Sequence, residues 1–314
     1  MNQPMRHKII LDVDPGHDDA MAILLAYKSP AIDLLAITTV AGNQTLEKTT
    51  LNTRRVCTVA GITDVPIAAG CDRPLVRPQT IADDIHGESG LDGPKFPEPT
   101  VPLDPRHAVD LIIDLLMKSD GDITLVPTGP LTNIAMAMRQ EPRIIKKIKH
   151  ISLMGGAYGF GNVTPSAEFN IYADAEAARI VFESGVPITM VGLDLTHQAL
   201  ATPAVVERIR ALNTPVSEMA VALLQFFAST YKKRQGFDSP PVHDPCAVAW
   251  VIDPSIVQTK KVRVDIETHA EFSYGRTVCD MFGDSPRPAN ALVATKLDFD
   301  RFWDIMLDAL RQYK

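Results

Sequence analysis

Short apolar runs alternate with longer amphipathic stretches over the first two thirds of the chain. Each short run has the length of a strand buried on both faces, and each longer stretch repeats its apolar residues at helical spacing. This alternation predicts an α/β fold with an open, mostly parallel sheet flanked by helices. The expected strands are 8–13, 32–40, 65–68, 122–127, 150–154 and 187–191, and the expected helices are 18–28, 45–60, 107–118, 131–139 and 173–184.

Beyond residue 194 the pattern changes. Amphipathic stretches over 203–212 and 215–233 follow one another without a strand between them, which favours a helical cap near the sheet. A loop containing proline and glycine, the apolar segment HDPCAVAW, the strand-like VRVDIE and a last helix over 299–312 complete the chain. Because no repeat, low-complexity tract or flexible linker divides these parts, we expect one domain over 1–314.

Composition and charge narrow the functional classes. The chain has 31 Lys and Arg against 38 Asp and Glu, a formal net charge of −7, which argues against a nucleic-acid partner. Apolar runs fall well short of the ~20 residues of a membrane-spanning helix, and residues 1–8 lack the apolar stretch of a signal peptide. The four cysteines have neither zinc-site nor redox spacing and are expected to be buried thiols. We therefore expect a soluble cytoplasmic protein with no membrane partner.

The first expected strand ends in an acidic cluster. Asp12-Val-Asp14-Pro-Gly-His-Asp18-Asp19 places four carboxylates in eight residues, where a buried strand gives way to a helix. Ligand sites in open α/β sheets lie beyond the carboxyl ends of the strands. A capping role at the helix N-terminus explains one aspartate, whereas four need a counterion. An all-oxygen cluster suits Ca²⁺ or Mg²⁺ better than zinc, a solvated acidic turn is the alternative, and the fixed ligand spacing of an EF-hand is missing.

A second acidic candidate is Asp244, in the segment Val-His243-Asp244-Pro245. It follows a loop rich in glycine and proline and begins an apolar helix. Asp244 is either an N-cap with Pro245 at the first helical position or a further ligand of the acidic site. In the second case His243 would lie at the rim of that site, and an imidazole beside a carboxylate–metal site is a candidate acid.

A third polar region suits a hydroxylated ligand. A strand ends at Met154 in a glycine turn, and Asn162 and the segment Glu168-Phe169-Asn170 follow. In an extended segment Glu168 and Asn170 point to one side and Phe169 to the other, so the two polar residues offer the mixed donors and acceptors that sugar hydroxyls need. A polar loop with an asparagine-supported turn is the alternative.

Two further residues are ambiguous on local grounds. Asn43, in Ala-Gly-Asn43-Gln-Thr, follows the second expected strand, where a helix-capping role explains it well. His86 lies in the glycine-rich segment Ile-His86-Gly-Glu-Ser-Gly, which would be able to fold over a site. A lone loop histidine is usually just solvated, so neither residue defines a site by itself.

Taken together, the motifs resemble the nucleoside hydrolase family. DVDPGHDDA, AGNQT, HGESGLDGP, LVPTGPLTNIA, LMGGAYGFGNVTPSAEFNIYAD, VGLDLTH and VHDPCAVAW occur in the family's order over nearly the whole chain. Within the family, the chain is most similar to the inosine-uridine preferring and the bacterial pyrimidine-specific enzymes. The resemblance implies a Rossmann-like domain that binds one Ca²⁺ and hydrolyses the N-glycosidic bond of ribonucleosides to ribose and free base, in purine and pyrimidine salvage. It also implies a homodimer or homotetramer.

The resemblance implies a role for each motif residue. Calcium would be held by Asp14, Asp19, Asp244 and the backbone carbonyl of Thr128, and Asp14 would activate the calcium-bound water. Positive charge that develops on the ribosyl ring would be stabilised by the acidic cluster. The ribose itself would be bound by Asp18, Asn43, Met154, Asn162, Glu168 and Asn170.

The same resemblance places the base. His86 and His243 would border it, with His243 as the proton donor. The segment 223–235 looks like the family's mobile base-facing helix, from which Tyr231 would stack on the base. An amphipathic helix of the core would have the same sequence pattern. Tyr231 matches the inosine-uridine type, whereas strictly pyrimidine-specific bacterial enzymes tend to have glutamine there and tyrosine one turn later, where this chain has Gln235. We predict broad inosine and uridine hydrolysis, with strict pyrimidine specificity as the alternative.

Two other classes share part of the pattern. In the haloacid-dehalogenase phosphatases, the first residue of a motif like Asp12-Val-Asp14 is a nucleophile and Mg²⁺ is the metal. Those enzymes have Thr or Val where this chain has Gly16, and the EFN and HDP segments would have no role. A non-catalytic nucleoside binder would use the same hydroxyl-binding residues, but most such bacterial binders are exported.

Overall fold

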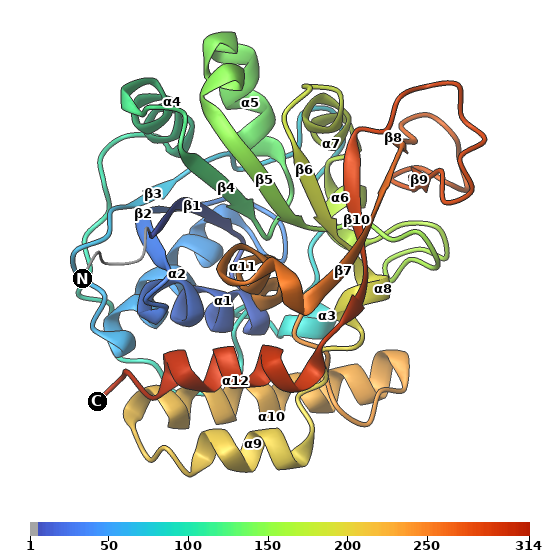
Figure 1. Cartoon of the computed structure of the whole chain (residues 1–314). Helices are drawn as coiled ribbons and strands as arrows, with labels where there is room; N and C mark the ends of the chain where they lie inside the picture. Colours follow the sequence, from blue (N-terminus) through green and yellow to red (C-terminus); the bar gives the residue numbers. More distant parts are fainter. Residues whose placement is uncertain (1–5) are drawn as a thin grey trace.

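Eight strands form the central sheet of the computed structural model, which describes residues 6–314 (Figure 1). Their order is β3-β2-β1-β4-β5-β6-β10-β7, and all neighbours are parallel except β10 and β7. The prediction that residues 1–8 lack a signal-peptide stretch falls, for residues 1–5, outside the described residues. The strands are β1 (His7–Val13), β2 (Ile32–Thr39), β3 (Ile67–Ala69), β4 (Ile123–Pro127), β5 (Ile148–Met154), β6 (Ile188–Val191), β7 (Val257–Val262) and β10 (Ala291–Leu297).

Helices cover both faces of the sheet because the central strands are apolar on both sides. In β1, Ile10 belongs to one hydrophobic core while Ile9 and Leu11 belong to the other. One face carries α4, α5 and α7, and the other carries α1, α2 and α11 (Figure 1). The helices are α1 (His17–Lys28), α2 (Leu46–Ala60), α4 (Ala108–Lys118), α5 (Thr132–Gln140), α7 (Ala175–Phe182) and α11 (Asp244–Ile252).

A further layer of helices lies outside α1 and α11. It consists of α9 (Pro203–Arg210), α10 (Pro215–Gln235) and α12 (Phe299–Leu310). The helix α10 extends to the short α3 (Asp83–His86) (Figure 1). These helices match the predicted segments 203–212, 215–233 and 299–312. Within the described residues, none of the helices has both the length and the apolar character needed to span a bilayer.

The strand order places a crevice at the centre of the sheet. The chain proceeds from β1 outward through β2 to β3, and then crosses to β4 on the other side of β1. Connections from β1 and β4 therefore leave in opposite directions, which opens a space beyond their carboxyl ends, where open α/β sheets bind ligands. The α/β class and the parallel sheet flanked by helices are confirmed.

Several elements were not predicted. The edge strand β7 carries exposed lysines, and its neighbour β10 carries one near its end, so neither pattern is a continuous apolar run. VRVDIE is divided between the end of β7 and β8 (Val264–Ile266), which pairs with β9 (Thr277–Cys279). The short helices α3 (Asp83–His86), α6 (Phe169–Ala173) and α8 (Leu193–Thr196) are too brief to leave a periodic signal, as are the 3₁₀ helices Pro142–Lys147 and Pro254–Ile256.

The cysteines differ in burial. Cys57 and Cys246 are buried free thiols, as predicted. Cys71 and Cys279 are free but only partly buried, so the prediction of four buried thiols is wrong for these two. Burial raises the pKa of the Cys57, Cys71 and Cys279 thiols to about 12, which leaves them protonated at neutral pH.

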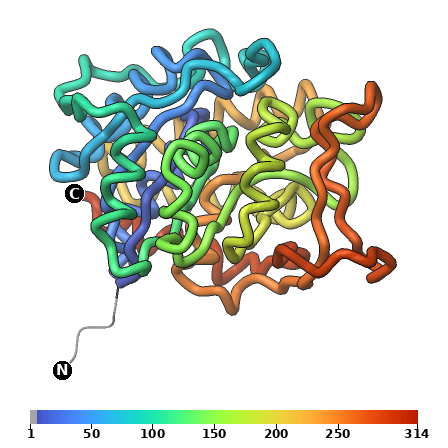
Figure 2. Tube along the Cα trace, turned by 90° about the horizontal axis from the view of Figure 1, so that it is seen from above, coloured from blue at the N-terminus to red at the C-terminus, as the bar shows by residue number. Residues whose placement is uncertain are grey.

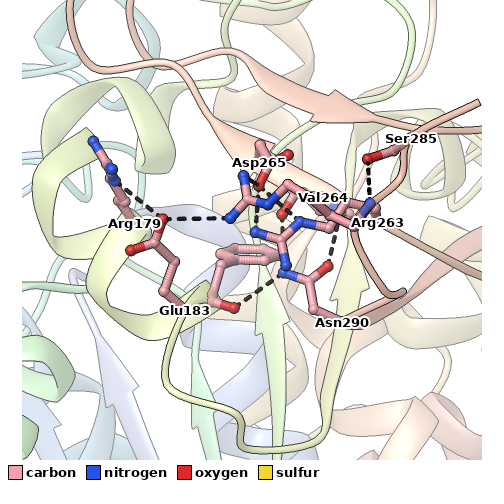
Figure 3. Close-up of polar contacts among 9 residues, drawn as sticks. Arg179, Glu183, Arg263, Val264, Asp265, Ser285 and Asn290 are labelled. Atoms are coloured by element: carbon pink, nitrogen blue, oxygen red, sulfur yellow. Dashed lines mark hydrogen bonds and ion pairs between the residues drawn. The ribbon is translucent and has the colours of Figure 1, made fainter.

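The segment 264–290 projects at the margin of the molecule (Figures 1 and 2). A polar network fastens its base to α7 and the sheet (Figure 3). Asp265 accepts from Arg263 and, at 2.7 Å, from Arg287. Asn290 accepts the N–H of Val264 at 2.7 Å and donates to the carbonyls of Val264 and Phe182 at 2.9 and 3.0 Å. One asparagine thus joins two strands to the end of a helix.

Replacing this asparagine should destabilise the fold without touching the pocket described below. Asn290→Ala leaves backbone groups of Val264 and Phe182 without partners, and we expect a loss of about 1–3 kcal/mol in the free energy of unfolding. Urea denaturation measures it. The control Gln258→Ala, at an exposed position of β7, should stay within about 0.5 kcal/mol of the parent. Equal stability of both variants would contradict the anchoring role.

Candidate functional site

A pocket opens at the carboxyl ends of β1, β4 and β5, between α3 and the end of α10. It is lined by every predicted site residue except Asp14 and Asp19, which lie beneath it: the lining includes Asp18, Asn43, His86, Thr128, Met154, Asn162, Glu168, Asn170, Tyr231, His243 and Asp244. Residues that were not predicted as site residues also contribute: Ile81, Ala82, Asp84, Ile85, Val163, Phe169, Phe227, Arg234 and Gln235.

Three carboxylates converge at the base of this pocket. Chain direction changes at Pro15-Gly16 after β1, so Asp18 and Asp19 fall in the first turn of α1. Asp244 is the first residue of α11, which packs beside α1. One oxygen from each of Asp18, Asp19 and Asp244 lies within 4.8 Å of the others. Residues more than two hundred positions apart in the sequence thus form one acidic group.

Capping accounts for only part of this group. Asp19 Oδ2 accepts the N–H of Gly16 at 3.0 Å, which is the predicted capping of the α1 N-terminus. Asp244 does not cap α11, because the cap residue is His243 and Asp244 makes no capping hydrogen bond. The alternative interpretation of Asp244 as only an N-cap is therefore wrong.

Asp14 lies at the end of β1 in a space bounded by two glycines. Its Oδ2 accepts the N–H of Asn43 at 2.7 Å, while Oδ1 is buried and has no hydrogen-bond partner among the described residues. A Cβ at Gly42 or Gly129 would collide with these carboxylate oxygens, so both positions require glycine for close approach. An unpartnered, fully buried carboxylate oxygen needs an external partner.

Burial and mutual repulsion raise the pKa of each carboxyl group here. Loss of solvation is the larger cause for Asp14, with the charge of Asp19 second, and burial raises the pKa of Asp18 to about 7. Burial likewise raises the pKa of Asp19 and of Asp244. Of the lysines and arginines that the structure describes, only Arg234 lines the pocket, and Arg234 is paired with Asp84.

The donor set fits a hard divalent cation. It consists of oxygen atoms only, includes the unpartnered Asp14 Oδ1, and carries a negative charge that no basic side chain neutralises in the described part of the chain. Thr128 follows β4 beside this group: its hydroxyl donates to Asp19 Oδ1 at 2.8 Å, and its carbonyl accepts from Asn170 Nδ2 at 2.7 Å. The solvated acidic turn does not describe these buried carboxylates.

Glu168 and Asn170 reach the pocket from a helix. Glu168 is the N-cap of α6 and accepts the N–H groups of Asn170, Ile171 and Gly156 at 2.8 to 3.1 Å. The predicted extended conformation holds for Glu168 itself but is wrong for Phe169 and Asn170, which begin the helix, and Phe169 lines the same pocket instead of pointing away. These three N–H groups lower the pKa of Glu168, but burial has the larger effect and raises it to about 7.

Asn43 and Asn162 also have partners that the local sequence does not reveal. Thr45, not Asn43, is the N-cap of α2, so the capping explanation of Asn43 is wrong. Asn43 Nδ2 instead donates to the carbonyl of Asp14 at 3.2 Å. Asn162 Oδ1 accepts the N–H of Phe169 at 2.9 Å, which ties the loop before α6 to the pocket wall.

His243 and Tyr231 form a buried pair in another part of the pocket wall. Tyr231 Oη lies 2.6 Å from His243 Nε2, and Thr196 Oγ1 lies 2.7 Å from His243 Nδ1. The backbone N–H of His243 donates to Asp18 Oδ2 at 3.1 Å. Burial lowers the pKa of His243 well below its usual range, so the ring is neutral at neutral pH.

His17 is a residue of this region that the sequence analysis missed. Its Nδ1 lies 3.0 Å from His86 Nδ1 and its Nε2 lies 2.8 Å from the carbonyl of Asp92. The ring also stacks on Phe226 and Phe227 of α10, with centroids 5.1 and 5.2 Å apart. His86 is therefore held rather than solvated. The only sequence signal is the position of His17 inside the acidic motif, because its partners lie far away along the chain.

The position of Asp12 argues against a phosphatase. Its Oδ1 accepts from the hydroxyl of Thr38 at 2.5 Å and from Asn133 Nδ2 at 2.8 Å, and Asp12 does not line the pocket. A nucleophile must face its substrate. Asp12 instead joins β1 to β2 and to α5.

Comparison with known proteins identifies the class. A model of the family described as inosine-uridine preferring nucleoside hydrolase matches residues 9–304. The pyrimidine-specific ribonucleoside hydrolases RihB of Shigella sonnei (strain Ss046) and Escherichia coli (strain K12) are each 52% identical to this chain over 308 residues, which cover 98% of each chain. The chain therefore belongs to the nucleoside hydrolase family.

Solved structures agree. The purine-preferring ribonucleoside hydrolase from Gardnerella vaginalis superposes with a TM-score of 0.91 at 33% identity, over 97% of this chain and 98% of that one. The plant nucleoside hydrolase PpNRh1 superposes with a TM-score of 0.90 at 32% identity, over 98% and 100%. The predicted family and enzymatic function, ribonucleoside hydrolysis, are confirmed. The roles of individual residues stay predictions.

Without a metal ion, the protein should lose stability as the pH rises. A carboxyl group whose pKa is higher in the folded than in the unfolded state binds protons preferentially when folded, so stability falls between the two pKa values. For Asp18 and Glu168 this window runs from the ordinary values of 3.8 and 4.5 up to about 7. We expect the melting temperature of chelator-treated protein to fall between about pH 4 and pH 7.

Two comparisons make this test specific. Added Ca²⁺ should flatten the dependence, because a bound cation favours the ionised carboxylates, and Asp18→Asn should reduce the slope of the metal-free protein. A melting temperature of the metal-free protein that rises over the same pH range would contradict this electrostatic account.

Proposed function

We propose that this chain is a calcium-dependent ribonucleoside hydrolase that cleaves uridine and cytidine best and inosine more slowly. The observation that carries the calcium assignment is the buried carboxylate group with the unpartnered Asp14 Oδ1 and no neutralising basic side chain within the described residues. Hard oxygen ligands of flexible number suit calcium. The pocket above this group is polar on the side where Glu168 and Asn170 lie, as a ribose requires.

Asp14, Asp19, Asp244 and the carbonyl of Thr128 would hold the ion. Calcium, when bound, would lower the pKa values of these carboxyl groups, bind vicinal ribose hydroxyls and make a neighbouring water more acidic. Asp14 would then be ionised at neutral pH and accept the proton of the attacking water on Oδ1. Support for this atom comes from its burial without a protein partner.

The ribose-binding residues follow from the same pocket wall. Asp18, Asn43, Met154, Asn162, Glu168 and Asn170 would position the sugar. As the bond between C1′ and the base nitrogen breaks, its electron pair leaves with the base and positive charge develops on the ribosyl ring. Ionised Glu168 and Asp18, both of them buried, would stabilise that charge.

At the base, His243 would act as proton donor through Tyr231. The 2.6 Å contact between Tyr231 Oη and His243 Nε2 supports this order: the tyrosine hydroxyl donates its proton to the departing base, and the imidazolium form of His243, a minor form at neutral pH that burial makes a stronger acid, passes its Nε2 proton to the tyrosine oxygen. His243 is then left as a neutral ring whose Nδ1–H donates to the hydroxyl of Thr196, 2.7 Å away. His86 would border the base from the opposite element, α3.

The proposed preference for pyrimidine nucleosides over inosine rests on similar proteins and on the residue at position 231. Relatives named pyrimidine-specific are 52% identical over nearly the whole chain, which favours uridine and cytidine. Tyr231 is typical of the inosine-uridine type, which favours some inosine cleavage. Broad hydrolysis of inosine and uridine stays a prediction, as does the homodimer or homotetramer. We also propose one domain over 1–314, because β1 and β10, from opposite ends of the chain, belong to one sheet.

Metal removal and restoration test the calcium assignment together with the substrates. Chelator-treated protein should release ribose from none of uridine, cytidine and inosine, and added Ca²⁺ should restore the release. We expect kcat/KM for uridine to exceed that for inosine by about tenfold or more, a difference of about 1.4 kcal/mol in transition-state binding. Full ribose release in the presence of the chelator would contradict calcium dependence, and equal kcat/KM values would contradict the preference.

Removing the carboxylate of Asp14 tests its role as the general base that accepts the proton of the attacking water. Asp14→Asn should lower kcat for uridine by about 10²–10⁴-fold, because an amide cannot accept the proton of water. The control is Asp120→Asn. Asp120 is exposed and lies just before β4, at the opposite end of the strand from the pocket, so this variant should keep the parent kcat. Turnover of Asp14→Asn at the parent rate would contradict the role.

Proton delivery to the base is tested by changing the leaving group. His243→Ala should lower kcat for uridine by about 10²–10⁴-fold but leave cleavage of a 4-nitrophenyl riboside nearly unchanged, because 4-nitrophenolate departs without a proton. Tyr231→Phe should act in the same direction. An equal loss on both substrates would instead indicate a structural role for this pair.

A further inference from the structure

An ion pair crosses the mouth of the pocket. It joins Asp84, in the short helix α3, to Arg234, in the last turn of α10, and both residues line the pocket. The two elements lie far apart in the sequence and meet over the site. Neither residue has a role in the proposed mechanism.

Each partner stands next to a residue at the base-binding end. His86 follows Asp84 by two positions in the same four-residue helix. Tyr231 precedes Arg234 by three positions in α10, and residues three apart lie on the same face of a helix. The distance between His86 and Tyr231 across the pocket therefore depends on how α3 is held against the end of α10.

The local charges support attraction between these two ends. The last turn of α10 carries Lys232, Lys233 and Arg234 before the helix ends at Gly236, and α3 begins with Asp83 and Asp84. Deeper in the protein, α3 and α10 are also in contact, because His86 of α3 stacks with His17 and Phe227, and His17 stacks with Phe226. The ion pair is the outer end of that contact, where the base has to enter.

We propose that Asp84 and Arg234 are positioning residues that hold His86 and Tyr231 at the spacing a base requires, and so set substrate affinity rather than the chemical step. The inference rests on the proposed assignment of the base to this end of the pocket. Their side chains are 43% and 56% exposed, and half-exposed ion pairs are weak. The expected effect is therefore about two- to fivefold in KM.

Single and exchanged charges test the pair. Asp84→Asn and Arg234→Gln should each raise KM for uridine about two- to fivefold and leave kcat within about twofold, and the exchange Asp84→Arg with Arg234→Asp should recover part of the loss. At high salt the parent should approach the single variants, because screening weakens the pair. The matched control is Arg208→Gln, which breaks the exposed pair with Asp304 between α9 and α12 and should leave KM unchanged.

The outcomes separate this inference from the enzyme function. Single variants with the parent KM, or an exchanged pair no better than the worse single variant, would overturn the positioning role. Variants that lose kcat and melting temperature together would overturn it too, since that pattern indicates a merely structural contact. If the parent releases no ribose at all, the hydrolase proposal fails instead, and dissociation constants of uridine measured by calorimetry in the same variants still test the pair.

Discussion

The burial of carboxylates beside one another is the constraint on which the site depends. Asp14, Asp18, Asp19 and Asp244 are all buried, and the described part of the chain brings no basic side chain to them. Such a group is unfavourable for a folded protein unless protons or a cation neutralise it. The fold keeps it nevertheless, with two glycines shaped around Asp14, which indicates that the charge is retained for ligand binding rather than for stability.

The sheet brings these charges together at one place. β1 and β4 end at the point where the strand order reverses, so Asp14 and Thr128 meet there, and α11 brings Asp244 to the same edge. Polar residues for the sugar lie on the β5 side, at Glu168 and Asn170. The base end is built by α3 and α10, outside the sheet. The acidic end is thus formed by the sheet and the helices that follow its strands, whereas the base end is formed by elements outside the sheet.

The parts predictable from sequence are those with a local or periodic signal. Parallel strands and long helices are recognised by their apolar spacing, and the acidic motif by its density of aspartates. Edge strands such as β7, with exposed lysines, and helices of four or five residues have no such signal. The capping explanation of Asn43 was wrong because a tertiary partner, Asp14, overrode the local preference. The extended conformation failed at Phe169 and Asn170 because Glu168 caps a short helix that begins there. His17 was missed because its role exists only through His86, sixty-nine positions away.

Direct binding of calcium tests the central claim most closely. Titration calorimetry of Ca²⁺ into chelator-treated protein should show one ion bound per chain, and binding should be lost or strongly weakened when Asp244→Asn removes one carboxylate from the group. Binding of one ion with that dependence would support the account of the buried carboxylates as a cation site. No Ca²⁺ binding by the folded protein, or binding that Asp244→Asn leaves unchanged, would contradict it.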